Sequence, residues 1–362
     1  YRFDQSRIEA LQQALAASNY FDRIEIGRGE IDAATLRVPL IVQLSPNLRT
    51  RYVVGVSYGT DEGAGVRGGI ERRWVNGRGH QFLGEAELAQ RRSALYAEYA
   101  LPQFAARISR YSIATRWQDE QTDNIDTRSF LLSGGAVARG HHWYAQASMN
   151  VLDGSFLVGA RSDGQPRQSA LVVYPEVRYE RVLADDRVRP ARGASLDVRV
   201  LGASDRVLSD VSVLQGRATL KGILPAGLGA RLIAQLTLGA TSTDDFDRLP
   251  PELRFFAGGD RSVRGYGYQD LGDRDAEGFP IGGLYLATTS LEYEREFMPG
   301  WSAAGFIDAG NVWSSGEPAL ELGVGAGLRW QSPVGPIRID IAHGFDDIAG
   351  GWQLHFSAGA DL

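Results

Sequence analysis

The sequence lacks cysteine altogether, which excludes a disulfide framework and a metal site built from thiolates. It also lacks any run of eighteen apolar residues, which argues against a membrane-spanning helix or a secretory signal segment within these residues. The five histidines show no ligand spacing, so we expect no metal site. A net charge of −6 argues against a nucleic-acid partner, and we expect none.

What the sequence does have is a two-residue period that starts near Arg49 and continues to the end of the chain. Leu236 and Leu238 share one face of a strand, for example, while Gln235 and Thr237 share the other. The pattern predicts sixteen strands. Their approximate bounds are 49–60, 64–75, 79–91, 94–102, 107–119, 127–139, 142–153, 168–182, 193–203, 209–222, 228–241, 283–297, 301–312, 320–331, 335–345 and 351–362.

No helices are predicted to cover either face of this sheet. An open sheet of sixteen antiparallel strands is too wide, whereas closure as a barrel removes both edges. The polar face then lines a lumen and the apolar face contacts lipid, which strands of about nine to thirteen residues can cross at a tilt. We therefore predict an all-β fold, a 16-stranded antiparallel transmembrane β-barrel over residues 48–362. A soluble β-sandwich array or propeller is the alternative, but no blade repeat is visible.

Residues 1–47 follow a different pattern. Apolar residues between Ile8 and Leu15 have helical spacing, and two short strands follow, the first ending at Ile26 and the second centred on Leu40. This is half of a small α/β module, so we expect Val38, Leu40 and Val42 to be exposed or poorly covered. Because the chain begins at a tyrosine and not at methionine, we expect a mature or trimmed piece whose upstream part has been removed.

The longest connection, residues 243–282, lies between the eleventh and twelfth strands and contains the sequence VRGYGY at 263–268. Such long connections are usually functional. A phosphate-binding glycine loop would need a following helix, and none is predicted. If the loop folds into the lumen, Arg264 needs acidic partners, and Glu292 and Asp308 lie on the polar faces of the next two strands. A guanidinium can bridge two carboxylates, although these acids could instead only line a wet lumen.

The glycine-rich segment GVGAG at 323–327 is predicted to be strand. Small residues there allow the barrel to bend or another backbone to approach. The segment HFSAG near the end of the chain lacks the strand, turn and helix that a catalytic serine requires. We therefore expect no catalytic residues, no cofactor and no enzymatic activity.

These linked motifs give the chain a resemblance to a known family. VRGY after the eleventh strand, FIDAG two strands later, GAGLRWQSPVGPIRIDIA beyond it and an upstream partial α/β module resemble the outer-membrane assembly-factor superfamily of BamA, TamA and the two-partner-secretion transporters. The resemblance implies that residues 1–47 are the C-terminal part of a periplasmic POTRA domain. It also implies that Arg264, with Gly265 and Tyr266 beside it, reaches Asp308 and Glu292 inside the barrel.

The ending LHFSAGADL is most similar to the TamA branch of this superfamily. That likeness implies a role in inserting or secreting outer-membrane proteins such as autotransporters, or in lipid transport, in the bacterial outer membrane with the N-terminal segment in the periplasm. The implied partners are a TamB-like periplasm-spanning inner-membrane protein, outer-membrane protein clients and outer-membrane lipids. A BamA-like insertase and a two-partner-secretion transporter are the alternatives within the superfamily.

The physical mechanism would be a lateral seam between the first and last strands, which offers an edge or thins the bilayer. We expect Val54, Val56, Gly351 and Gly359 at this seam, because glycines weaken a ladder. From another class of function, a passive diffusion channel would tolerate changes at Arg264 with altered selectivity only. A hydrolase carried on a barrel is a third alternative, but no nucleophile paired with a general base can be identified in the sequence.

Overall fold

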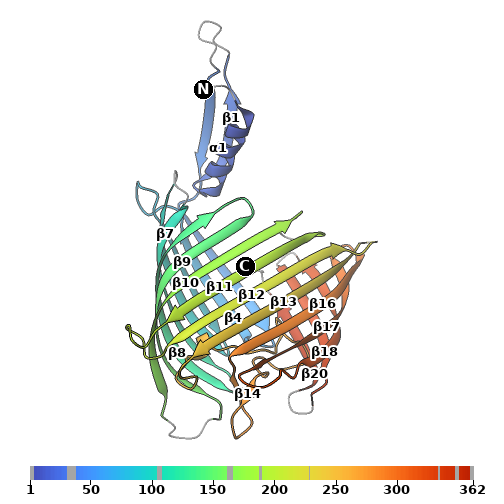
Figure 1. Cartoon of the computed structure of the whole chain (residues 1–362). Helices are drawn as coiled ribbons and strands as arrows, with labels where there is room; N and C mark the ends of the chain where they lie inside the picture. Colours follow the sequence, from blue (N-terminus) through green and yellow to red (C-terminus); the bar gives the residue numbers. More distant parts are fainter. Residues whose placement is uncertain are drawn as a thin grey trace.

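The computed structural model describes residues 4–30, 38–103, 108–160, 166–186, 190–227, 229–332, 335–346 and 350–358. They form a barrel of tilted strands and a small N-terminal module that stands at one end of it (Figure 1). Among the described residues, no helix is long and apolar enough to span a membrane.

The N-terminal module consists of one helix and two antiparallel strands, α1 (Gln5–Ala17), β1 (Phe21–Arg28) and β2 (Leu40–Pro46). The helix begins where the Asp4 side chain accepts a hydrogen bond from the backbone N–H of Ser6. On β2 the side chains of Leu40 and Val42 are exposed, as the sequence predicts, whereas Val38 just before the strand is half-buried. This sheet therefore leaves apolar surface open to solvent.

The barrel is closed, and every strand pairs antiparallel with its neighbours. All sixteen predicted strands are present, which confirms the predicted barrel. They are β3 (Thr50–Gly59), β4 (Gly63–Arg72), β5 (Gln81–Ala89), β6 (Arg92–Pro102), β7 (Arg110–Gln121), β8 (Ile125–Arg139), β9 (Trp143–Val158), β10 (Gln168–Ala184), β11 (Gly193–Ala203), β12 (Val213–Pro225), β13 (Ala230–Thr243), β16 (Tyr285–Met298), β17 (Trp301–Trp313), β18 (Glu321–Ser332), β19 (Gly335–Gly344) and β20 (Gly351–Ala358).

Two expectations about strand length were wrong. The connection between β4 and β5 runs over 73–80, longer than the three residues 76–78 left between the predicted strands, because Arg73 and Gly79 contact the N-terminal module. The Arg73 guanidinium donates to Asn47 at 2.9 Å, and the Tyr20 hydroxyl donates to the Gly79 carbonyl at 2.6 Å. Strands β8 to β10 have 15 to 17 residues, longer than the predicted 127–139, 142–153 and 168–182, and their ends pack against the long loop described below.

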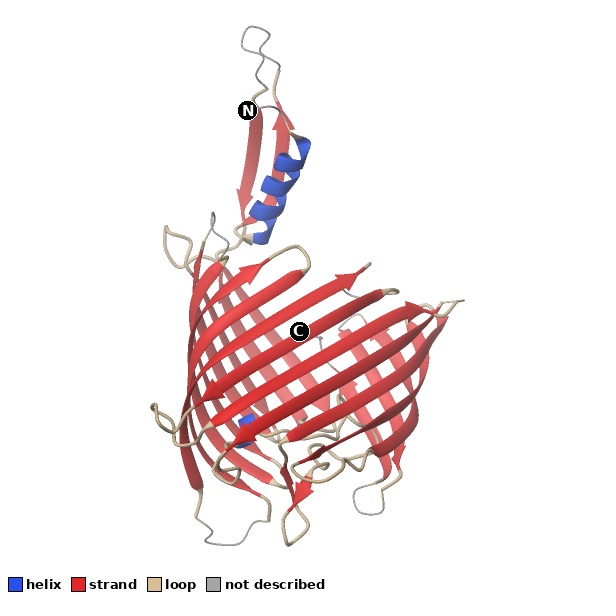
Figure 2. Ribbon diagram, in the orientation of Figure 1, coloured by secondary structure: helices blue, strands red, loops and turns tan. Residues whose placement is uncertain are grey.

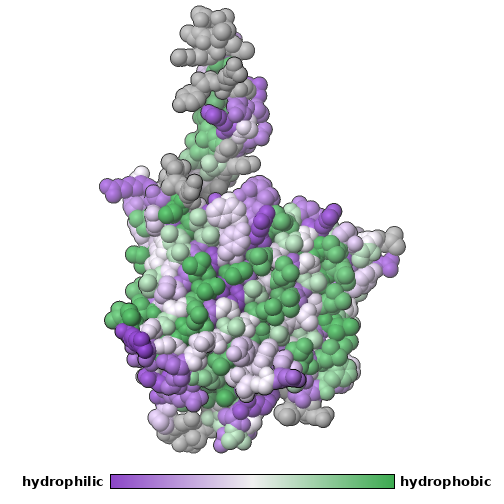
Figure 3. All heavy atoms as spheres, in the orientation of Figure 1, coloured by the Kyte–Doolittle hydropathy of each residue, from purple (hydrophilic) through white to green (hydrophobic). Residues whose placement is uncertain are grey.

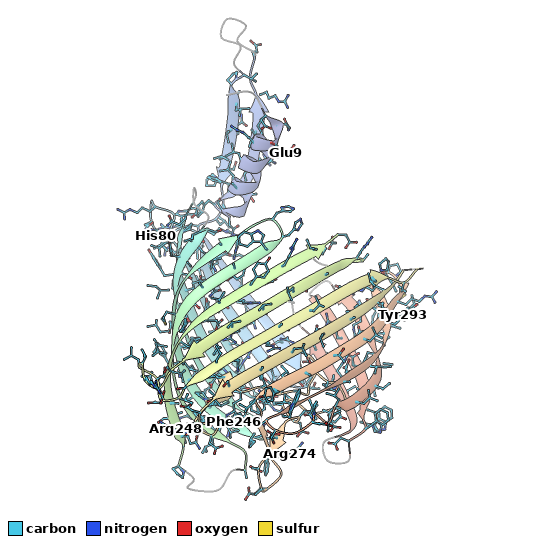
Figure 4. The ribbon with its side chains drawn as sticks, in the orientation of Figure 1. Glu9, His80, Phe246, Arg248, Arg274 and Tyr293 are labelled. Carbon is cyan, nitrogen blue, oxygen red and sulfur yellow. The ribbon has the colours of Figure 1, made fainter. Side chains whose placement is uncertain are left out.

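The two faces of the barrel wall differ as the two-residue period predicts. On β13, Leu236 and Leu238 are exposed on the outside, while Thr237 is buried on the lumen side. Hydrophobic side chains cover much of the outer wall (Figure 3), and Tyr293 projects from it in Figure 4. An apolar exterior around a polar interior requires lipid as the surrounding solvent.

Residues 243–282, which we call the plug loop, follow the eleventh strand and therefore leave the barrel at the end opposite the N-terminal module. The loop contains the short helix η1 (Pro251–Leu253) and the strands β14 (Asp273–Arg274) and β15 (Pro280–Gly282). It fills part of the barrel interior at that end (Figure 2). In Figure 4 the loop residues Phe246 and Arg274 lie there, far from His80 beside the module.

The base of the plug loop belongs to the main hydrophobic core. Leu249 and Leu253 are fully buried against lumen-facing side chains of β9 to β12, among them Leu152, Phe156 and Leu201. The Gln215 side chain also donates to the Leu253 carbonyl at 2.6 Å. One wall of the barrel thus fixes where the loop begins.

We predict that Leu236→Arg destabilises the barrel in lipid by about 2–4 kcal/mol, because it places a charge on the lipid face near the middle of β13. Equilibrium unfolding from lipid vesicles by urea measures this loss. Leu208→Arg is the control, since Leu208 is even more exposed than Leu236 but lies outside the strands. Equal effects at the two positions would contradict a lipid-facing wall.

Candidate functional site

The tip of the plug loop lies inside the barrel against a second wall, formed by β16 to β19. Val263 and Tyr266 are fully buried there, and Arg264 is only 7% exposed. The motif predicted from the sequence is therefore in the lumen and not at the surface. A cation so far removed from water needs charged partners close by.

Asp308 on β17 is the main partner of Arg264, and it is 0% exposed. Its carboxylate accepts hydrogen bonds from the Arg264 backbone N–H at 3.1 Å, from Nε at 2.7 Å and from Nη2 at 3.0 Å. The Ser290 hydroxyl on β16 donates a fourth, at 2.6 Å. Both carboxylate oxygens are thus satisfied by a guanidinium bound through two of its nitrogens, which lysine cannot reproduce.

Glu292 on β16 takes the remaining arm of the guanidinium. Arg264 Nη1 donates to it at 2.7 Å, so one arginine bridges the two carboxylates expected from the sequence. Two further residues complete the network. Arg329 on β18 donates to Glu292 at 3.2 Å and to Asp340 on β19 at 2.5 Å.

Arg329 and Asp340 were not predicted as members of this network, although both lie in the segment GAGLRWQSPVGPIRIDIA. They sit directly across from Arg338 and Gly327 in the strand register, so no charge pair is apparent along either strand. The alternating pattern does put both side chains on the lumen face of their strands. That shared face was the one available signal.

The Arg264 guanidinium also lies over an aromatic ring, with its central carbon 3.3 Å from the centroid of Phe306. A buried cation gains from the negative face of such a ring. Burial lowers the pKa of Arg264, but the hydrogen bonds and charges of Asp308 and Glu292 outweigh it, so the pKa is raised overall. The guanidinium therefore stays charged throughout the physiological range.

Glycines on β18 make room for the loop backbone. A Cβ atom on Gly323 would lie 1.9 Å from the Arg264 carbonyl oxygen, and one on Gly325 would collide with the Phe306 ring. Of the two explanations offered for the segment 323–327, the close approach of another backbone is the one realised here. Without these glycines Arg264 could not reach Asp308 in this conformation.

Gly265 and Tyr266 fix the loop on the side of β18 to β20. Gly265 has a φ of +99°, and a Cβ atom there would collide with the backbone of Gly344. Its N–H donates to Nε2 of His355 on β20 at 3.2 Å. The Tyr266 hydroxyl donates to the Leu322 carbonyl at 3.1 Å and accepts from the backbone N–H of Phe345 at 3.2 Å.

A second arginine, which was not predicted from the sequence, holds the base of the plug loop. Arg254 donates to the carbonyl oxygens of Leu249, Asp247 and Ile281 at 2.8, 2.7 and 3.2 Å. Burial lowers its pKa to about 10, against a smaller opposing effect of nearby acids such as Asp247. Its acceptors all belong to the loop itself, so Arg254 shapes the loop and does not attach it to the wall.

Among the residues that the structure describes, the predicted seam has few main-chain contacts. Strands β3 and β20 share two register pairs, Ser357 with Gly59 and Ala358 with Tyr58. Every other pair of neighbouring barrel strands shares at least eight among the described residues. Val54 and Val56 are 87% and 78% exposed on β3, and Gly351 begins β20. Gly359 lies outside the described residues.

A sequence profile of the Omp85 superfamily domain matches residues 175–361, which is more than half of the chain. The chain belongs to the Omp85 superfamily. A sixteen-stranded barrel with an apolar outer wall, in a chain of this superfamily, belongs in the bacterial outer membrane.

One curated relative in the Omp85 superfamily is the outer membrane protein assembly factor BamA of Nitratidesulfovibrio vulgaris. It is 26% identical over 369 residues, covering 95% of this chain and 45% of that protein. The chain therefore spans a little under half the length of this relative.

Solved structures of Omp85-type barrels share the fold. BamA from Haemophilus ducreyi lacking POTRA domains 1–3 has a TM-score of 0.82 at 15% identity, covering 98% of this chain and 78% of that chain. CdiB from Acinetobacter baumannii has a TM-score of 0.60 at 16% identity, with 97% and 67% covered. CdiB from Escherichia coli has 0.61 at 13%, with 97% and 70% covered.

We predict that Arg264→Ala destabilises the docked plug loop by about 3–5 kcal/mol, because it leaves Asp308 buried and unpaired. Thermal unfolding in detergent measures the loss. Asp308→Ala combined with Arg264→Ala should cost much less than the sum of the two single changes. Additive effects in this double-mutant cycle would mean that the ion pair contributes nothing.

We predict that Gly323→Ala displaces the plug loop and costs about 1–3 kcal/mol, because the added methyl group overlaps the Arg264 carbonyl oxygen. The matched control is Gly305→Ala on the adjacent strand, where a Cβ atom meets nothing within 4 Å. Protease accessibility of the loop, measured beside thermal unfolding, separates loop release from a general loss of stability. Equal protection of the loop from protease in both variants would show that Gly323 is not needed to make room for the loop backbone.

Proposed function

We propose that this protein is an outer-membrane assembly and translocation factor that inserts or secretes outer-membrane proteins through a lateral seam between β3 and β20. The observation that carries the proposal is the sparse pairing of these strands, two register pairs against at least eight elsewhere among the described residues. A strand with unpaired backbone groups is a template on which another strand can form. The 26% sequence identity with BamA, over 95% of this chain, supports the same kind of activity.

The wall near the seam is also shorter than the opposite wall. Strands β3, β4 and β19 have 10 residues each, whereas β8, β9 and β10 have 15, 16 and 17. A shorter apolar wall favours a thinner bilayer beside it, at a cost that grows with the mismatch. A thinned bilayer next to an unpaired edge would lower the barrier for inserting a new strand.

Within the superfamily we propose a TamA-like role, with autotransporter-like outer-membrane proteins as clients, lipid as an alternative cargo and a TamB-like inner-membrane protein as partner. The ending of the chain supports this branch. The curated relative supports the alternative of a BamA-like insertase, and for the alternative of a two-partner-secretion transporter the likeness to CdiB supports a shared fold alone. We further propose that residues 1–47 are the C-terminal part of a POTRA domain in the periplasm. The helix and two strands at one end of the barrel are consistent with this assignment.

A passive diffusion channel fits the structure less well. The plug loop packs its base on β9 to β12 and its tip on β16 to β19, so it crosses the lumen and is fixed at both walls. A loop anchored in this way occupies part of the lumen, whereas a passive channel needs an open path for solutes. The chemistry of the site is ionic and hydrogen-bonded throughout, and no covalent step is part of the proposal.

The seam can be tested by locking it. Since the chain has no cysteine, Gly59→Cys with Ser357→Cys introduces one pair at directly opposed positions of β3 and β20. We predict that oxidation abolishes insertion of an autotransporter client into vesicles containing this protein, and that reduction restores it.

The control pair is Thr219→Cys with Thr237→Cys, at positions of β12 and β13 whose hydroxyl oxygens are 3.1 Å apart. This pair should be harmless in both redox states. Full insertion activity with the seam locked would eliminate the lateral mechanism.

A further inference from the structure

The tip of the plug loop makes hydrogen bonds on both sides of the seam. On the β20 side, the Gly265 N–H donates to Nε2 of His355 at 3.2 Å. On the β3 side, the Asp260 N–H donates to Oδ2 of Asp61, in the turn after β3, at 2.9 Å. Both acceptor side chains are buried, with 4% of His355 and 9% of Asp61 exposed. The loop therefore connects two strands that share only two register pairs among the described residues, beside one further main-chain bond from the Thr60 N–H to the Phe356 carbonyl at 3.1 Å.

The bond to His355 depends on the protonation of its ring. Nε2 can accept from Gly265 only while it carries a lone pair, so the ring must be neutral with its proton on Nδ1. That Nδ1 atom is buried and has no hydrogen-bond partner among the described residues. A second proton, on Nε2, would turn the acceptor into a donor that faces the Gly265 N–H.

Charged groups surround His355 on every packed element. Asp260 and Arg264 face it from the plug loop, Asp308 from β17 and Asp340 from β19, where Asp340 is its direct partner in the strand register. Three of these four groups are acids. Arg264 is held by Asp308, so its charge is already balanced. Asp340 is likewise held by Arg329, and burial of the ring is the largest effect, so the surroundings favour the neutral ring that accepts from Gly265.

Protonation of Asp61 acts in the opposite sense, through burial and the neighbouring Asp260 carboxyl group and not through the Asp260 N–H, which binds an ionised carboxylate at least as well. Burial, together with the adjacent Asp260 carboxyl group, raises the pKa of Asp61 to about 7. Glu62 in the same turn adds negative charge, while Arg91 donates only to the Asp61 backbone carbonyl, at 3.2 Å. Below this pKa one proton can be shared by the two aspartates, and above it two carboxylates repel each other.

We propose that the plug loop is a brace across the seam, and that His355 and Asp61 are positioning residues whose protonation states decide whether the brace holds. Neutral His355 keeps the loop on β20, and protonated Asp61 keeps it on the turn after β3. The brace is complete only in a window of pH. This inference rests on the seam of the proposed function, since it states what keeps that seam closed.

The direction of each pH effect follows from which state binds the proton. Docking at Asp61 is favoured at low pH, and the benefit falls as pH rises from the ordinary aspartate pKa of 3.8 towards about 7. Docking at His355 requires the unprotonated ring, so it weakens as pH falls below the pKa of the imidazole. The seam should be most firmly closed between these limits and should open more often on both the acid and the alkaline side.

The experiment measures the seam directly in the full chain, reconstituted in lipid nanodiscs. Spin labels are attached at Val56→Cys on β3 and Leu354→Cys on β20, two lipid-facing positions outside the register pairs. Their distance distribution is recorded from pH 5 to pH 9 by pulsed electron spin resonance. We expect the population of long distances to rise on each side of a minimum, by up to about tenfold per pH unit for each titrating proton.

Conservative variants separate the rise in long distances on the acid side, the acid limb, from the rise on the alkaline side. His355→Gln keeps an acceptor that does not titrate, so the rise in acid should disappear while the alkaline rise remains. Asp61→Asn should remove the alkaline rise alone, and the double variant should hold the seam closed across the whole range. His355→Leu, which cannot accept, should give the acid-state distribution at every pH. A merely structural role for either residue would shift stability without moving these pH profiles.

A distance distribution that is unchanged by pH in the unaltered barrel would overturn the brace, as would an acid limb that survives His355→Gln. Folding of each variant is checked by its resistance to unfolding in detergent at room temperature, so a collapsed barrel is not mistaken for an open seam. The readout involves no client protein. A failure of the brace would therefore leave the lateral mechanism standing, whereas only the seam lock described above can remove that mechanism.

Discussion

The burial of Asp308 is the constraint on which the interior of this barrel depends. A fully buried carboxylate must be paired, and here four hydrogen-bond donors surround it, three of them from Arg264. Because the pairing uses the backbone N–H as well as the guanidinium, it fixes the course of the loop and not only the position of one side chain. The path of Val263 to Tyr266 through the lumen follows from this single requirement.

The wall is shaped to receive that path. Gly323 and Gly325 leave β18 bare where the loop backbone and Phe306 lie, and Gly344 does the same for the Tyr266 ring. The base of the loop is held separately, by Leu249 and Leu253 on the wall of β9 to β12. Anchoring at two walls makes the plug loop a strut across the lumen, and its stiffness is what allows contacts at its tip to restrain the strands beside it.

The sequence predicts those parts of this structure that follow from a local pattern. The two-residue period identifies all sixteen strands, and it places Asp308 and Glu292 on the face that Arg264 reaches. Arg329 and Asp340 could not be assigned to the same network, because their contacts depend on how neighbouring strands are staggered. His355 and Asp61 are farther still from prediction, since they meet the loop only after a chain of more than three hundred residues has closed on itself. The sequence shows that a buried charge such as Arg264 needs a partner of opposite charge. It does not show which residues meet the loop once the barrel has closed.

The balance of energies at the seam assigns different roles to the two groups of contacts. A main-chain hydrogen bond contributes about 1 kcal/mol net, so the two register pairs of β3 and β20 contribute little more than the two bonds made by the loop tip. The Arg264 network contributes several times as much free energy, because breaking it leaves a buried charge unpaired at a cost of about 3–5 kcal/mol. When the seam opens, the weaker bonds at His355 and Asp61 must therefore break first, while Arg264 stays paired. The tip of the plug loop then stays bound to the wall of β16 to β19, and the seam strands β3 and β20 move relative to it.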